Sequence, residues 1–262
     1  MEGKKIPRND IVDLSDYGRE LAIFIAKPLA KLKVKAWQVT VFHFFLMVYC
    51  SFLVYKNTYS SLALASIFLM FKNIFDAVDG SIARIQNRPS KTGRFLDSNL
   101  DFLGHLLLFS VIRGVSPFLM LAGFFSFIFQ GSVFNYYFVL FRHYDKGDKT
   151  SKIEENGENE YPYDNRYVVK VLYWFYLVFY KWQDKLIDII DVNLLKCGRK
   201  KPDRNFLAYI SIFGPGFQYL FVILFFILGK PSLIPLFFLL PYNGLLLIAF
   251  LMRKRCKEGG YE

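Results

Sequence analysis

Four aspartates fall within one short stretch of the chain and offer carboxylates that could hold divalent metal ions. They are Asp76, Asp79, Asp97 and Asp101, and long apolar segments lie on both sides of them. An acid at the centre of a membrane helix costs about 2.5–3.5 kcal/mol on insertion scales, so a cluster of four needs compensating charge. Carboxylate oxygens are ligands that suit Mg²⁺ and Mn²⁺. The cluster therefore predicts a metal site.

Helical spacing would bring these acids onto two faces that can meet. On a helix over residues 66–86 and on another over residues 93–113, motif residues three, four, seven or eight apart share one face. The first face carries Asp76, Asp79, Gly80, Ala83 and Arg84, and the second carries Gly93, Asp97 and Asp101. Residues 87–92 form a polar, turn-rich connection. We therefore expect two antiparallel neighbouring helices whose acidic faces meet.

The same two faces also suit a phosphate group. Gly80, Ala83 and Gly93 have little or no side chain, so a ligand or another backbone can approach closely. Arg84 offers a planar fork of donors that matches phosphate. Metal ligands, a phosphate-binding arginine and small residues together indicate phosphoryl transfer from a nucleotide.

The whole motif resembles the signature of the CDP-alcohol phosphotransferases, also called class I CDP-alcohol phosphatidyltransferases. That signature reads D-x2-D-G-x2-A-R-x8-G-x3-D-x3-D, and each of its eight fixed positions is filled within residues 76–101. The resemblance implies an enzyme of phospholipid biosynthesis. Such an enzyme transfers a phosphoalcohol group, here a phosphatidyl group from CDP-diacylglycerol, to a polar alcohol acceptor and releases CMP.

The resemblance also implies a role for each motif residue. The metal ligands of a two-metal Mg²⁺ or Mn²⁺ site are Asp76, Asp79, Asp97 and Asp101. Asp101 is in addition the base that takes the proton of the acceptor hydroxyl. The residues that contact the CDP moiety are Gly80, Ala83, Arg84 and Gly93. Asp97 is followed by Ser98 rather than proline, which favours serine- or inositol-phosphate-type members over glycerol-phosphate-type ones.

Three further polar residues lie close to the motif in the sequence and are candidates for a substrate cavity. Lys72 and Asn73 come about one turn before Asp76. Lys72 either forms an ion pair with Asp76 or reaches the interface, or it lines the cavity. His105 follows Asp101 by four residues, where it could assist the acceptor or the metal ligands.

Composition predicts an all-α integral membrane protein. The chain is 54% hydrophobic and contains 30 Phe and 17 Tyr, and its apolar residues gather in long runs. The net charge of +11 comes from basic residues between these runs, which indicates a positive-inside bias and no nucleic-acid partner. About six transmembrane helices are expected, over residues 37–55, 60–78, 95–115, 118–141, 205–229 and 233–252. His43, within the first, is expected to be a packed or pore-facing histidine rather than a ligand.

The segments between the predicted spans give the rest of the expected architecture. Residues 17–34 alternate apolar side chains with lysine and arginine, which predicts an N-terminal amphipathic helix at the membrane interface. Residues 142–204 form a cytoplasmic insertion in what we expect to be a single domain over residues 1–262. Within it, residues 142–166 predict a solvated loop, and residues 167–192 an aromatic-rich interfacial helix with an amphipathic extension.

The predicted topology places both termini and the motif at the cytoplasmic face. Only Lys56, Arg113 and Lys230 then lie at or near the outer side, in agreement with the positive-inside rule. The membrane would be a bacterial inner membrane or an ER-type membrane, and the family resemblance implies a homodimer among membrane lipids. The alternative function is a transporter or ion-coupled carrier, which predicts acids spread over several spans and internal symmetry. Here the acids cluster around one turn.

Overall fold

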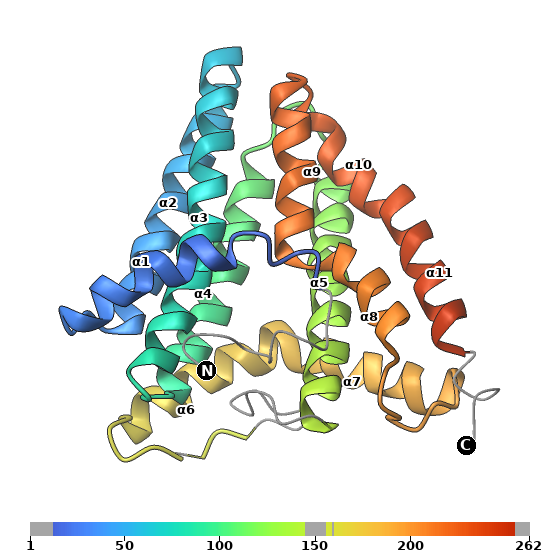
Figure 1. The fold of residues 1–262 in the computed structure, drawn as a ribbon. Coiled ribbons are helices and arrows are strands. Elements are labelled where there is room, and N and C mark those ends of the chain that lie inside the picture. The colour runs from blue at the N-terminus through green and yellow to red at the C-terminus, as the bar shows by residue number, and fades with distance from the viewer. Residues whose placement is uncertain (1–12, 145–155, 159, 255–262) are drawn as a thin grey trace.

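The computed structural model describes residues 13–144, 156–158 and 160–254, and each regular element in them is a helix (Figure 1). In chain order these elements are α1 (Arg19–Lys31), α2 (Ala36–Lys56), α3 (Tyr59–Ile85), α4 (Lys91–Ser110), α5 (Pro117–Tyr144), α6 (Arg166–Tyr176), η1 (Leu177–Lys181), α7 (Trp182–Ile189), η2 (Ile190–Leu194), α8 (Arg204–Ile210), η3 (Ser211–Phe213), α9 (Pro215–Ile227), η4 (Pro231–Leu233), α10 (Ile234–Leu239) and α11 (Pro241–Lys254). The all-α prediction is therefore confirmed for the described residues.

Five stretches of the described chain are long and apolar enough to cross a membrane. They are Ala36–Lys56, Tyr59–Ile85, Pro117–Tyr144, Arg204–Ile227 and Pro231–Lys254. The remaining predicted span, residues 95–115, corresponds to α4, which does not belong to this set because its first half carries several charged residues. Helix α4 packs against α2, α5 and α6 within the bundle. The chain is an integral membrane protein with five apolar spans, and α4 is a more polar helix that packs among them.

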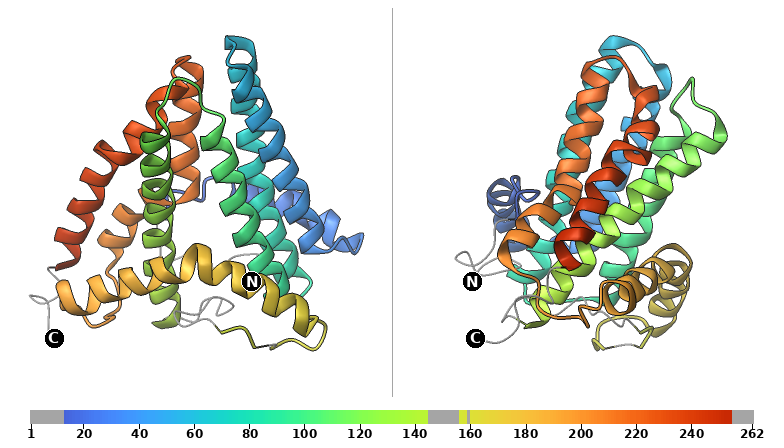
Figure 2. Two further views of the ribbon diagram at one scale, coloured as in Figure 1. Left: turned by 180° about the vertical axis from the view of Figure 1, so that it is seen from behind. Right: turned by 90° about the vertical axis from the view of Figure 1, so that its right-hand side faces the viewer.

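The two predicted interfacial segments run across the bundle and lie on opposite sides of it (Figure 2). Helix α1 buries Ala22 and Ala26 against α3 and leaves Phe24 exposed. The stretch from α6 to α7 packs against α4 and α5 with one face. Its other face exposes an apolar stripe at helical spacing, made of Tyr167, Val171, Trp174, Val178, Trp182, Leu186 and Ile189. This pattern is typical of helices that lie in a membrane interface.

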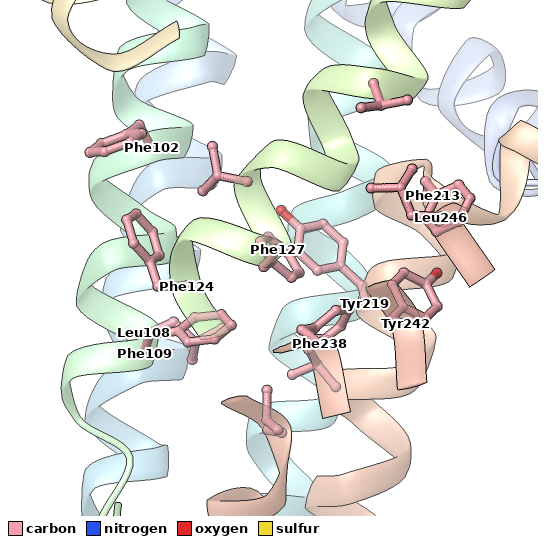
Figure 3. Packing of buried hydrophobic residues seen from close by; sticks show 14 of the residues in the cluster. Phe102, Leu108, Phe109, Phe124, Phe127, Phe213, Tyr219, Phe238, Tyr242 and Leu246 are labelled. Atoms are coloured by element: carbon pink, nitrogen blue, oxygen red, sulfur yellow. The ribbon is translucent and has the colours of Figure 1, made fainter. Parts of the chain in front are cut away.

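An aromatic core joins the second half of the chain to the helices that carry the motif (Figure 3). The rings of Phe102 on α4 and Phe179 on η1 stack with centroids 4.1 Å apart. Such ring pairs add about 0.5–1.5 kcal/mol beyond the burial of their apolar area. Gly123 on α5 lets this helix pack closely against α10, since a Cβ atom there would lie 2.5 Å from the Pro235 backbone.

The last two spans are each interrupted just before a proline that begins the next helix. In the span Arg204–Ile227, the short helix η3 ends at Phe213 and α9 begins at Pro215. The segment before α1 fills this break, because a Cβ atom on Gly216 would lie 2.0 Å from the carbonyl oxygen of Ser15. In the last span, α10 ends at Leu239 and α11 begins two residues later. These breaks let the C-terminal helices bend around the core.

The described part of the insertion is anchored to the turn between α3 and α4, in contrast to the solvated loop that we predicted over residues 142–166. Asp164 accepts hydrogen bonds from Ser90 Oγ (2.6 Å) and from the backbone N–H of Lys91 (2.7 Å), so its carboxylate caps the first turn of α4. The buried ammonium of Lys91 pairs with Glu160 at 2.9 Å. Residues 145–155 and 159 of the predicted loop lie outside the described residues.

Candidate active site

Three of the four predicted metal ligands come together in the structure. One oxygen each of Asp76, Asp97 and Asp101 and a ring nitrogen of His43 all lie within 4.8 Å of one another. Asp76 is on α3 and the other two acids are on α4, so the acidic faces meet as the spacing predicted. Helix α2 packs against both α3 and α4 and brings His43 to the same place.

The fourth predicted ligand, Asp79, lies beside this cluster and is held by α2. Its Oδ2 atom accepts a hydrogen bond from Thr40 Oγ1 at 2.7 Å and lies 3.3 Å from His43 Nε2. Asp79, Thr40 and His43 are all buried. Asp79 is therefore held by two side chains of α2.

Lys72 lies in the site and bridges two of its acids. Its ammonium is 3.0 Å from Asp76 Oδ1 and 2.7 Å from Asp101 Oδ1, and its side chain is only 2% exposed. Of the interpretations left open by the sequence, the ion pair with Asp76 is present, and it extends to Asp101. The aromatic ring of Tyr219 lies 5.3 Å from the same ammonium. Pairing with two carboxylates and a ring compensates the cost of burying the charge.

The residues predicted to contact the CDP moiety line the same side of α3 and α4 and remain partly exposed. These residues are Gly80, Ala83, Arg84 and Gly93. The Arg84 guanidinium lies directly over Gly80, because a Cβ atom at residue 80 would be 3.3 Å from an Arg84 guanidinium nitrogen. Gly93 lies in the first turn of α4, where its N–H donates to Ser90 Oγ at 2.9 Å. The Arg84 guanidinium thus covers Gly80, and Ser90 lies against Gly93, on the two helices that carry the acids.

The other two predicted cavity residues make contacts away from the acids. His105 is buried on α4, and its Nε2 atom lies 2.7 Å from the Tyr219 hydroxyl. Asn73 donates a hydrogen bond to the Tyr17 hydroxyl at 3.4 Å, on the side of α3 that faces the N-terminal segment. Among the predicted neighbours of the motif, Lys72 is therefore the one that reaches the carboxylates.

Three residues of the site were not among the predicted site residues. Thr40 and His43 lie three residues apart on α2 and so share a face, but that face carries no acid to mark it. Tyr219 comes from α9, more than a hundred residues after the motif in the chain. A polar pair at helical spacing in an otherwise apolar span is the one local signal that could have indicated Thr40 and His43.

The donor set fits a divalent ion. Three carboxylates supply the hard oxygen ligands that suit Mg²⁺ and Mn²⁺. Asp97 Oδ1 is buried and has no hydrogen-bond partner among the described residues, although it lies 3.4 Å from His43 Nε2. A buried carboxylate oxygen without a hydrogen bond is costly, and a metal ion would satisfy it.

Comparison with known proteins agrees with the signature. The family model for CDP-alcohol phosphatidyltransferase matches residues 34–155, which contain helices α2 to α5 and all four aspartates. Residues 34–155 carry a CDP-alcohol phosphatidyltransferase domain. An archaetidylinositol phosphate synthase from Pyrococcus horikoshii is 35% identical to this chain over 91 residues. The aligned stretch covers 34% of this chain and 47% of that relative, so the chain spans about half the length of the relative it matches.

The similarity to CDP-alcohol phosphatidyltransferases explains the position of the acids better than the ion-coupled carrier hypothesis does. The four acids lie on two consecutive helices, with three of them in one cluster and Asp79 beside it, whereas a carrier of this kind predicts coupling acids on several spans. The transporter alternative is therefore not favoured.

Proposed function

We propose that this protein transfers a phosphatidyl-type group from a CDP-linked lipid to a polar alcohol and releases CMP. The observation that carries the proposal is the meeting of Asp76, Asp97 and Asp101 in one cluster within a CDP-alcohol phosphatidyltransferase domain. In the reaction, the acceptor oxygen forms a bond to the phosphorus that bears the lipid alcohol. The bond from that phosphorus to CMP breaks, and CMP leaves with the electron pair.

Each side chain of the site has a role that its position supports. Asp76, Asp97 and Asp101, with Asp79 beside them, would hold one or two ions of Mg²⁺ or Mn²⁺, which offset the diphosphate charge and stabilise leaving CMP when bound. Arg84, which lies over Gly80, offers its guanidinium N–H groups to a phosphate oxygen, and Ala83 and Gly93 are further contacts of the CDP moiety in this proposal. Asp101 accepts the proton of the acceptor hydroxyl at a carboxylate oxygen.

The acceptor that we propose is an inositol phosphate. Two observations support it, namely the Asp97-Ser98 sequence and the similarity to a protein named archaetidylinositol phosphate synthase. The lipid donor is then CDP-diacylglycerol or a CDP-linked archaetidyl lipid. The competing acceptors, to be compared with inositol phosphate in the same assay, are serine, inositol and glycerol 3-phosphate.

We further propose that the site opens toward the cytoplasm and that residues outside 34–155 belong to the same domain. The turn from α3 to α4, which contains Arg88, and the segment before α8, which contains Lys200, lie at one end of the bundle (Figure 1). The turn after α2, which ends at Lys56, and the turn after α9, which contains Lys230, lie at the other end. Packing of α9 on α3 supports one domain. Residues 1–12 and 255–262 lie outside the described residues, so the cytoplasmic location of both termini stays a prediction, as does the homodimer.

The proposal is tested by incubating purified protein with each CDP-lipid, Mg²⁺ or Mn²⁺ and one acceptor at a time. We expect CMP and a new phospholipid in equal amounts with inositol phosphate, and loss of both in Asp101→Asn. Turnover with a different acceptor would correct the substrate but keep the reaction class. Absence of CMP release with every donor and acceptor, by protein that binds the metal, would overturn the enzyme proposal.

A further inference from the structure

An imidazole from outside the signature is part of the acidic cluster. His43 Nε2 lies 3.3 Å from Asp79 Oδ2, 3.4 Å from Asp97 Oδ1 and 3.9 Å from Asp76 Oδ1. The His43 side chain is 0% exposed. The other ring nitrogen, Nδ1, is buried without a hydrogen-bond partner among the described residues. The polar contacts of this ring are therefore directed at the carboxylates through Nε2.

The distances match those between ligands of one ion. An ion about 2.1 Å from each ligand atom separates adjacent ligand atoms by about 3.0 Å and opposite ones by about 4.2 Å. The separations from His43 Nε2 to Asp97 Oδ1 and to Asp76 Oδ1, 3.4 and 3.9 Å, fall within this range. Helix α2 would thus supply a ligand in addition to those of α3 and α4.

The environment of Asp79 leaves His43 available for this role. Thr40 Oγ1 already donates a 2.7 Å hydrogen bond to Asp79 Oδ2. Asp79 therefore keeps a donor when His43 Nε2 turns its lone pair to an ion. The alternative is that His43 is a protonated imidazolium that pairs with Asp79 and Asp97 and holds no metal.

We propose that His43 Nε2 ligates a divalent ion together with Asp76, Asp97 and Asp101, and that this nitrogen makes the site prefer Mn²⁺ over Mg²⁺. The proposal rests on the metal site of the proposed function. Mg²⁺ binds chiefly oxygen ligands and holds its waters, whereas imidazole nitrogen suits first-row transition ions. A set of three carboxylates and one imidazole therefore favours Mn²⁺ more than carboxylates alone would.

Pulsed electron paramagnetic resonance on Mn²⁺ bound to the full chain tests this directly, because a coordinated imidazole nitrogen modulates the electron spin echo. We expect nitrogen-14 modulation from wild type and its loss in His43→Gln. His105→Gln is the matched control, since it removes another buried imidazole near the acids, one that faces the Tyr219 hydroxyl. We expect this control to keep the modulation. His43→Gln should weaken Mn²⁺ binding at least about tenfold, and Mg²⁺ binding less.

A second measurement needs no substitution, in case His43→Gln does not fold. The chain contains three histidines, and His43 is the one that reaches the acids, since His105 pairs with Tyr219 and His143 is exposed at the end of α5. Wild type labelled with nitrogen-15 histidine should replace the nitrogen-14 pattern with that of nitrogen-15. Bound Mn²⁺ whose spectrum does not respond to the label would overturn the His43 proposal and leave the metal site standing. Wild type that binds no Mn²⁺ would instead overturn the metal site on which the proposed function rests.

Discussion

The Lys72 ammonium lies 2.7 Å from Asp101 Oδ1 and 3.0 Å from Asp76 Oδ1, so one buried lysine joins acids on two different helices. In metal-free protein this cation offsets part of the repulsion among the aspartates. An incoming metal ion meets an ammonium already bound to two of its ligands. Lys72 therefore competes with the metal while it stabilises the protein without metal.

Lys72→Met should destabilise the metal-free protein and increase its response to metal. Removing one partner of a buried ion pair costs about 3–5 kcal/mol, and we expect the lower end because Asp76 and Asp101 remain 25% and 23% exposed. Thermal unfolding in detergent, with and without Mn²⁺, measures both effects. Lys230→Met removes an exposed lysine and is the control. Equal Mn²⁺ shifts in Lys72→Met and wild type would contradict the competition between lysine and metal.

Asp164 connects the insertion to the site by capping α4. Asp164→Ala should cost about 1 kcal/mol, as for other lost N-caps, and should speed hydrogen exchange at residues 88–95. The matched control is Asp203→Ala, which removes the Asp203 hydrogen bond to the Phe206 N–H at the start of α8. Exchange in the control should increase at α8 and not at α4. Unchanged exchange at residues 88–95 in Asp164→Ala would show that the insertion does not hold this turn.

Gly123 allows α5 and α10 to approach closely. A Cβ atom there would lie 2.5 Å from the Pro235 backbone, which cannot move aside without shifting α10. We expect Gly123→Ala to destabilise the protein by about 1–3 kcal/mol, the usual cost of overpacking. Gly244→Ala is the control, since a Cβ atom there has nothing within 4 Å. Equal unfolding temperatures for the two variants would contradict the close approach of α5 and α10.

Helical spacing within the motif predicted which aspartates lie on the same face of each helix. Asp76 shares a helical face with Asp79, and Asp97 shares one with Asp101, so the facing pairs followed from helical periodicity. The apolar runs likewise predicted the five spans, because hydropathy is a property of each segment alone. Helix α4 departs from that pattern because Lys91, Arg94 and Asp97 all lie in its first half.

The remaining contacts depend on how distant segments pack. His43 was expected to be a packed or pore-facing histidine, because nothing near it in the chain indicates that α2 lies against two acidic helices. Tyr219 and Asp164 reach the motif helices from segments far along the sequence. The predicted solvated loop over residues 142–166 was wrong for Asp164 because a solvated loop and an anchored loop can have the same polar composition. Such contacts follow from the tertiary fold and have no periodic signal.

The most direct test of the central claim is whether CMP release from a CDP-lipid depends on metal held by this cluster. Protein stripped with a chelator should release no CMP, and Mn²⁺ or Mg²⁺ should restore release. Asp97→Asn should lower the restored rate at least about a hundredfold, the scale of losing one transition-state charge contact. Asp203→Asn, which keeps a capping side chain at α8, should match wild type. CMP release that survives chelation, or that Asp97→Asn leaves unchanged, would contradict a metal-dependent transferase centred on these aspartates.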